Sequence, residues 1–196
     1  MFISTTLAIF ALLSTTAFSD VHEIDKAHSS VNFKIRHLFA KTTGQFKKFT
    51  GDFNYHPKAI EKSTFTFVID ADSIYTDNEK RDKHLRSKDF FWVEKHKKIS
   101  FKSKGVKDLG QNKFTVMGDL TMRGVTKPIN VNMAYLGQVK DPWGNMKAGF
   151  EATAKLNRKD FGILWNKNLD SGGFILGDDV DIEIFLETTN KSTKTM

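Results

Sequence analysis

The sequence predicts an all-β fold, an antiparallel barrel of about eight strands with a short helical insert at its rim. Most of the 196 residues alternate between apolar and polar side chains with the period of a β-strand. Turn signals rich in Gly, Asn, Asp and Pro separate these runs. Because a long antiparallel sheet removes its exposed edges by closing on itself, we expect an up-and-down barrel, with a two-sheet sandwich as the alternative.

The first 19 residues have the pattern of a secretory signal peptide. They contain no charged side chain, and an apolar run from Leu7 to Leu13 precedes the small-x-small sequence Ala17-Phe18-Ser19. The run is shorter than the about 20 residues that span a bilayer, which disfavours an uncleaved anchor. We therefore expect cleavage after Ser19, export to the periplasm, a barrel domain over residues 20–188 and a frayed polar tail over residues 189–196.

Composition narrows the possible functions. The chain has no cysteine, which excludes disulfides and thiol catalysis. Its net charge is +7, but the lysines are scattered at alternate positions of the predicted strands, a pattern typical of solvent-facing sides. We expect no nucleic-acid partner. Weak attraction to anionic lipid headgroups, with transient membrane contact, and a homodimer remain open.

The first half of the barrel is predicted over residues 21–25, 29–39, 44–55 and 64–71. In the second of these runs Val31, Phe33, Ile35 and His37 share one face. The apolar parity shifts between residues 46 and 49, so we expect a bulge near Lys47-Lys48.

Residues 76–92 interrupt the alternation and predict the helical insert. Thr76-Asp77-Asn78-Glu79 has the pattern of a capping box, with Thr76 as the N-cap. Asp77 and Arg81, like Asp82 and Arg86, are four positions apart and can pair on one helical face. A second short turn then carries Phe90-Phe91-Trp92.

The second half of the barrel is predicted from strands that begin near residues 99, 114, 129, 148 and 180. Turn signals at 109–112, 123–128 and 141–145 connect the first four of them. Residues 157–177 are rich in Gly and Asp and predict an ordered long loop.

The inward faces of these strands form a candidate ligand tunnel. Small residues such as Gly118, Ala152 and Ala154 accompany the large ones, so the interior is either filled or hollow, and the pattern leaves both open. A lining with few hydrogen-bonding groups suits a long hydrocarbon. The predicted lining is Phe33, Ile35, His37, Phe53, Phe67, Ile69, Phe101, Val116, Leu120, Met122, Val131, Met133, Phe150 and Leu156.

Side chains of the insert form a candidate rim. They either pin the insert to the barrel through ion pairs or contact the head group of a ligand. The rim candidates are Arg81, Asp82, His84, Leu85, Phe90 and Phe91.

The sequence predicts neither a metal site nor an active site. The six histidines include no H-x-x-x-H or H-E-x-x-H spacing, and there is no G-x-S-x-G or phosphate-binding loop. His37 lies on an apolar strand face, where a buried, hydrogen-bonded histidine is expected. His28 and Ser29 are expected to cap a turn.

From Val21 to Glu187, the chain resembles the YceI-like family of polyisoprenoid-binding, lipocalin-like proteins. The resemblance rests on the motifs Ile24-Asp25, His28-Ser29, Val31-x-Phe33-x-Ile35-x-His37, Gly44-x-Phe46, Ser73-Ile74-x-Thr76, Arg81-Asp82-x-His84-Leu85, Asp89-Phe90-Phe91, Gly118-Asp119-Leu120-Thr121, Gly124-Val125-Thr126-Lys127-Pro128, Gly149-Phe150, Asn157-Arg158-x-Asp160-Phe161-Gly162 and Gly177-Asp178-x-Val180.

The resemblance implies an extended lipocalin-like barrel that binds and carries a polyisoprenoid or another long-chain amphiphile in the periplasm. It implies binding rather than catalysis, no obligatory cofactor, and a bound polyisoprenoid or quinone-like molecule. Two alternatives remain: an enzyme or chaperone acting on isoprenoid-quinone intermediates, and a stress protein with a filled barrel.

Overall fold

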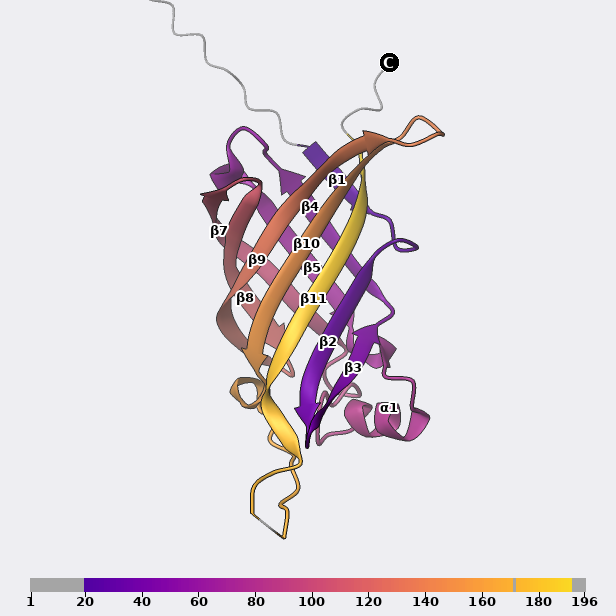
Figure 1. The fold of residues 1–196 in the computed structure, drawn as a ribbon, viewed down its shortest axis with the longest axis vertical. Helices are drawn as coiled ribbons and strands as arrows, with labels where there is room; N and C mark the ends of the chain where they lie inside the picture. The colour runs from indigo at the N-terminus through magenta and orange to yellow at the C-terminus, as the bar shows by residue number, and fades with distance from the viewer. Residues whose placement is uncertain (1–19, 171, 192–196) are drawn as a thin grey trace, which may run out of the picture.

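In the computed structural model, which describes residues 20–170 and 172–191, eleven strands form one antiparallel sheet that closes on itself (Figure 1). The predicted signal peptide lies outside the described residues. The strands are β1 (Asp20–Ile24), β2 (Ser30–His37), β3 (Ala40–Phe46), β4 (Phe49–Tyr55), β5 (Thr64–Asp70), β6 (Ile74–Tyr75), β7 (Lys98–Gly110), β8 (Lys113–Met122), β9 (Val125–Lys140), β10 (Met146–Asn157) and β11 (Leu176–Asn190).

The eleven strands occupy eight positions around the barrel. β1 and β2 both pair with β11 and share one position, whereas β3 and β4 share the next. β5 pairs with β4 and β6 with β3, so they share the third. The break between β3 and β4 at Lys47-Lys48 is the irregularity that the shifted parity predicts. The predicted eight-stranded antiparallel barrel is therefore confirmed, and the sandwich alternative is wrong.

One end of the barrel is filled with aromatic side chains. Phe150 on β10 is 1% exposed, and its ring centroid lies 5.3 Å from those of both Tyr55 and Tyr135. The Phe150 ring also packs edge-on against His22, at 5.6 Å. These rings close the end at which β1 lies and at which β9 turns into β10 (Figure 1).

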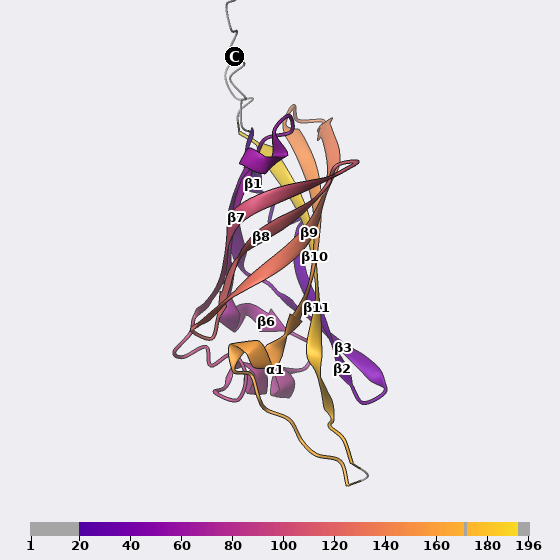
Figure 2. The same ribbon diagram turned by 90° about the vertical axis from the view of Figure 1, so that its left-hand side faces the viewer.

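The helical insert lies at the opposite end (Figures 1 and 2). It contains α1 (Glu79–Arg86), and the turns η1 (Ile60–Lys62) and η2 (Ala71–Ser73) precede it. The predicted capping box is wrong: the N-cap is Asn78, whose side-chain oxygen accepts from the Arg81 amide at 3.0 Å. Thr76 follows β6 directly, and its hydroxyl instead donates to Asp82 Oδ1 at 2.5 Å.

The two ion pairs predicted within α1 do not form either. Arg81 donates to the Thr76 hydroxyl and carbonyl, at 2.7 and 2.6 Å. Arg86 reaches out of the helix to Asp72, with 3.1 Å between Nε and Oδ1. Both arginines therefore bind residues of the segment before α1 rather than carboxylates within α1.

The predicted long loop at residues 157–177 has local order. It opens with η3 (Arg158–Phe161) and continues into a narrow paired segment, in which Asn168 forms a bridge with Phe174. The segment projects beyond α1 at the open end, as both views show (Figures 1 and 2). The Arg158 side chain holds its base by donating to the carbonyls of Ile163 and Trp165, both at 2.8 Å.

The last strand continues past the predicted limit at residue 188. Thr188 and Asn190 are buried, and His22 of β1 pairs with Asn190. The predicted tail over residues 189–196 therefore begins too early, because Thr189 and Asn190 belong to the sheet; residues 192–196 lie outside the described residues. Within the described part of the chain, no helix is long and apolar enough to cross a membrane.

Candidate functional site

The half of the barrel nearer α1 encloses a cavity of about 570 Å³. Such a volume is within the about 300–1,000 Å³ typical of pockets for small organic ligands. Its inner end is bounded by Phe53, Phe65, Met133, Ala152 and Leu186, next to Phe150: Leu186 is the cross-strand partner of Phe150, and Ala152 follows Phe150 by two residues on β10. Both interpretations of the interior are thus right in part, because one end is filled and the other is hollow.

The cavity wall contains all but two of the predicted lining residues. The exceptions are Val116 and Phe150, which are 0% and 1% exposed and pack in the core. Both lie on the predicted inward face, but at positions where other side chains fill the interior. The predicted residues found on the wall are Phe33, Ile35, His37, Phe53, Phe67, Ile69, Phe101, Leu120, Met122, Val131, Met133 and Leu156.

Small residues have two different roles along this face. Ala152 and Ala154 are on the wall and leave space where larger residues would fill it. Gly118 is buried, and a Cβ there would lie 2.5 Å from the ring of Phe101. Gly118 thus allows Phe101 to pack flat against β8 and does not itself line the cavity.

The predicted lining also missed part of the wall. Ile182 and Ile184 of β11 belong to it, and their alternation was visible in the sequence. Ile163, Trp165 and Leu176 belong to it as well, but they come from the irregular segment before β11 and its first residue, where no periodicity marks them.

The cavity is deep. Leu176 and Leu186 both lie on its wall, ten positions apart on β11. At about 3.3 Å per residue and a strand tilt of about 40°, this separation corresponds to about 25 Å along the barrel axis. One leaflet of a bilayer gives an acyl chain only about 15 Å, half of the hydrocarbon core. The cavity therefore suits a chain longer than an ordinary acyl tail.

Charged groups on the wall are all cationic and lie toward the mouth. Lys80 and Arg81 come from α1, and Arg158 comes from η3. Among the described residues, no carboxylate lies on the wall. Burial lowers the pKa of Arg158, and Asp178, 3.2 Å from its guanidinium, opposes this effect. Because Arg158 is occupied by the protein, Lys80 and Arg81 are the cations available to a ligand.

The rim candidates divide between the two roles that the sequence left open. Arg81, His84, Leu85, Phe90 and Phe91 lie on the cavity wall. Asp82 does not: it is buried and accepts from the Thr76 amide and hydroxyl. Of the two roles that the sequence left open, Asp82 therefore has the structural one, which is to fix α1 in place.

His84 connects α1 to the segment beyond η3. Its ring packs edge-on against Trp165 at 4.9 Å and against Phe90 at 5.0 Å, while Nε2 lies 3.0 Å from Asp89 Oδ2. His37, by contrast, is exposed at the end of β2. The expectation of a buried His37 is wrong because β2 has passed the edge of the closed barrel at that point.

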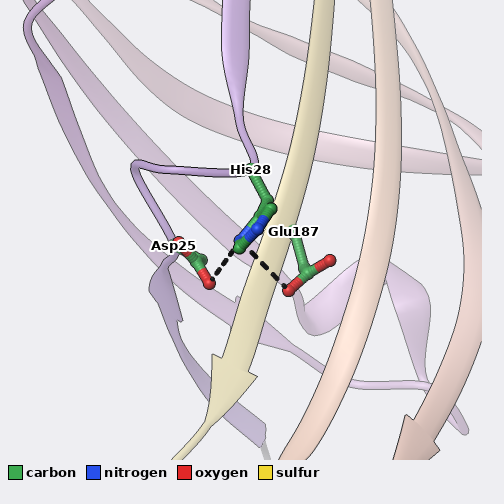
Figure 3. Close-up of side chains that lie close together, drawn as sticks. All are labelled: Asp25, His28 and Glu187. Atoms are coloured by element: carbon green, nitrogen blue, oxygen red, sulfur yellow. Dashed lines mark hydrogen bonds and ion pairs between the residues drawn. The ribbon is translucent and has the colours of Figure 1, made fainter. Parts of the chain in front are cut away.

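A second polar cluster lies outside the cavity, where β1 turns into β2 (Figure 3). His28 Nδ1 lies 3.1 Å from Asp25 and 3.9 Å from Glu187, a set of atoms close enough to hold a metal ion. However, the Lys147 ammonium already lies 2.7 Å from Asp25 and 3.2 Å from Glu187. It holds the pKa of Asp25 well below its usual range, with help from His28. The cluster is therefore an ion-pair network that joins β10 and β11 to the turn.

Comparisons with known proteins agree with this architecture. The family described as YceI-like domain matches residues 22–188. A UPF0312 protein of Vibrio parahaemolyticus is 39% identical over 191 residues, which cover 96% of this chain and 97% of that protein. The crystal structure of a Campylobacter jejuni YCEI protein is 31% identical, with a TM-score of 0.67 and coverage of 86% and 96%.

A polyisoprenoid binding domain from Saccharophagus degradans, implicated in plant cell wall breakdown, is also similar. It has a TM-score of 0.61 and covers 86% of this chain and 98% of its own. Because the two sequences are 16% identical, this likeness shows the shared fold alone.

Proposed function

The chain belongs to the YceI-like family, and from that premise we propose that its barrel binds one long-chain amphiphile of the polyisoprenoid class. The tail would lie in the cavity and the head group at the mouth. The observation that carries this proposal is the cavity itself, about 570 Å³ with an apolar wall that has cations only toward its open end.

The energetics of burial support a long apolar tail. Each methylene removed from water contributes about 0.8 kcal/mol, so ten methylenes contribute about 8 kcal/mol. Association costs about 4–15 kcal/mol in lost freedom, so a short tail would bind weakly and a long one tightly. The depth of about 25 Å favours the long one. The name of the Saccharophagus degradans domain, which is that of a polyisoprenoid binder, favours an isoprenoid among long chains.

The cations at the mouth favour an anionic or hydrogen-bond-accepting head group. Nε and one terminal nitrogen of Arg81 donate hydrogen bonds to Thr76. The other terminal nitrogen of Arg81 is left to donate to a ligand. Lys80 is exposed and adds a second charge from the same helix. A phosphate ester satisfies both groups, and a quinone carbonyl satisfies one.

We propose binding and transport rather than catalysis, in the periplasm and after cleavage at Ser19. Most of the wall consists of Phe, Ile, Val, Leu, Met and Ala, and it has no carboxylate among the described residues, so it offers little acid–base chemistry to a bound tail. A carrier needs only to shield the tail from water and to release it.

Titration with two soluble short-chain probes tests the proposal. Trp165 lies on the wall, so its fluorescence should change when farnesyl phosphate or farnesol enters, and Trp165→Phe should remove that signal. Replacing Lys80 and Arg81 by Gln should weaken farnesyl phosphate binding by roughly tenfold to a hundredfold, the loss of one or two charge-assisted hydrogen bonds, and leave farnesol unchanged. Failure of the wild-type protein to bind either probe would refute the proposed function.

A further inference from the structure

Four large apolar side chains are exposed around the cavity mouth. Leu38 and Phe39, in the turn between β2 and β3, are 39% and 100% exposed. Leu164 and Phe174, in the segment between η3 and β11, are 65% and 60% exposed. The two segments are joined, because the Leu38 amide donates to the Ile175 carbonyl at 2.9 Å. Leu38, Phe39, Leu164 and Phe174 are called the rim patch below.

The rim patch lies on two neighbouring parts of the chain at the open end. Figures 1 and 2 show the segment before β11 extending beyond α1, with the β2–β3 turn at the same end of the barrel. Because the Leu38 amide donates to the Ile175 carbonyl, the turn and the segment lie side by side, and one surface can touch both. Exposed apolar residues that gather beside the opening of an apolar cavity mark an interaction site more often than scattered ones do.

The charges around the rim patch identify its partner. Arg36, Lys80 and Lys167 are exposed, and among the described residues none has a carboxylate within 4 Å of its charged nitrogens. Lys159 Nζ lies 5.8 Å from the ring centroid of Phe174, although this ammonium is already paired with Asp178 Oδ2 at 2.7 Å. The sequence also has no acidic residue between Asp25 and Asp52, the stretch that contains the turn. Apolar side chains flanked by free cations are typical of a surface that meets anionic lipid.

From these observations we infer that the rim patch docks on the surface of a bilayer that contains anionic phospholipid. Docking brings the cavity mouth against the lipid, so that an amphiphile passes between bilayer and cavity without its tail crossing water. This inference rests on the proposed function, because it supplies that site with its route of loading. A second copy of the chain fits less well, because it would bring the same free cations against each other.

Flotation with lipid vesicles tests the inference. The wild-type protein should float with vesicles of equal parts phosphatidylcholine and phosphatidylglycerol, and much less with phosphatidylcholine alone or at high salt. Replacing Phe39 and Phe174 by Ser should lower partitioning by roughly tenfold for each ring removed. The matched control replaces Val139 and Trp143, which are 66% and 84% exposed near the β9–β10 turn at the other end, and should not change it.

Two further measurements separate this inference from the proposed function. Both double variants should bind soluble farnesyl phosphate as the wild type does, whereas the rim variant alone should take up vesicle-borne lipid more slowly. Equal flotation of the two variants would overturn the inference, and so would a dimer that depends on the rim patch without vesicle binding, as seen by sedimentation. A wild-type protein that floats but binds no farnesyl phosphate would refute the proposed function and support the docking surface.

Discussion

Replacing Val131 by Glu places a carboxylate on the cavity wall, and the same change at Val116 provides a matched control. The two valines pair directly across β8 and β9. Val131 lies on the wall and is half-buried, whereas Val116 is 0% exposed, is not on the wall and packs among core side chains. The sequence predicted that both valines line the cavity, whereas the structure places only Val131 on the wall. Comparing the two variants therefore tests where the cavity ends and the packed core begins.

The expected magnitudes differ strongly. At position 116 the change loses about 1.5–3 kcal/mol of apolar burial and adds about 1–3 kcal/mol for a dry polar group. The sum of about 4 kcal/mol is a large part of a typical stability of about 5–15 kcal/mol. At position 131 the carboxylate points into the cavity rather than into packed side chains, so the expected loss is smaller, about 1–2 kcal/mol.

Ligand affinity should respond in the opposite order. A hydrated carboxylate at position 131 that displaces about four methylenes of the tail costs about 3 kcal/mol, more than a hundredfold in affinity. Because an apolar cavity raises the pKa of a carboxyl group, binding should partly recover at low pH.

Urea unfolding and farnesyl phosphate titration give the two readouts, with Val131→Met as the apolar control. Val131→Glu should fold and fail to bind, whereas Val116→Glu should be strongly destabilised. Wild-type affinity in Val131→Glu, or equal destabilisation of both variants, would refute the reasoning.

The remaining predictions concern the insert, the ion-pair network and export. Asn78→Ala should lower the free energy of unfolding by about 1 kcal/mol, the usual loss of an N-cap, and an unchanged urea midpoint would contradict its assignment. Lys147→Met should destabilise the fold most near neutral pH, because Lys147 depresses the pKa of Asp25. The contact stabilises the fold above about pH 4, the pKa of the Asp25 carboxyl in the unfolded chain, and this stabilisation is lost progressively as the pH falls below that value. Thermal unfolding of the wild type and of Lys147→Met across that pH range measures the difference in their stability. A difference that grows on acidification would contradict the prediction. The intact mass of protein recovered from the periplasm should match a chain that begins at Asp20. Recovery of the full-length chain in the membrane fraction would contradict cleavage after Ser19.

Alternation of apolar residues was sufficient to predict the barrel, and most of the residues predicted to line the cavity do lie on its wall. It tells which face a side chain takes, because the period of a strand is two residues. It does not tell how far along the barrel the filling stops. That boundary lies between Phe150 and Ala152, neighbours on the same face of β10, and is set by rings that arrive from β1, β4 and β9.

Short motifs near the mouth were less reliable because tertiary partners decide their roles. Thr76 and Glu79 match a capping box, but Asp82 and Arg81 engage the Thr76 hydroxyl, and Asn78 caps the helix instead. Trp165 joins the wall from an irregular segment that tertiary contacts place, among them the Arg158 side chain and the rings of His84 and Phe90. No local pattern in the sequence carries that information.

Native mass spectrometry of the protein purified from cells without detergent tests the central claim most directly. The account predicts one bound amphiphile per chain, identified after extraction as a long isoprenoid with a polar head, present in the wild type and in Val131→Met and absent from Val131→Glu. A wild-type protein that carries no lipid and takes none up from farnesyl phosphate or polyprenyl phosphate solutions would contradict it.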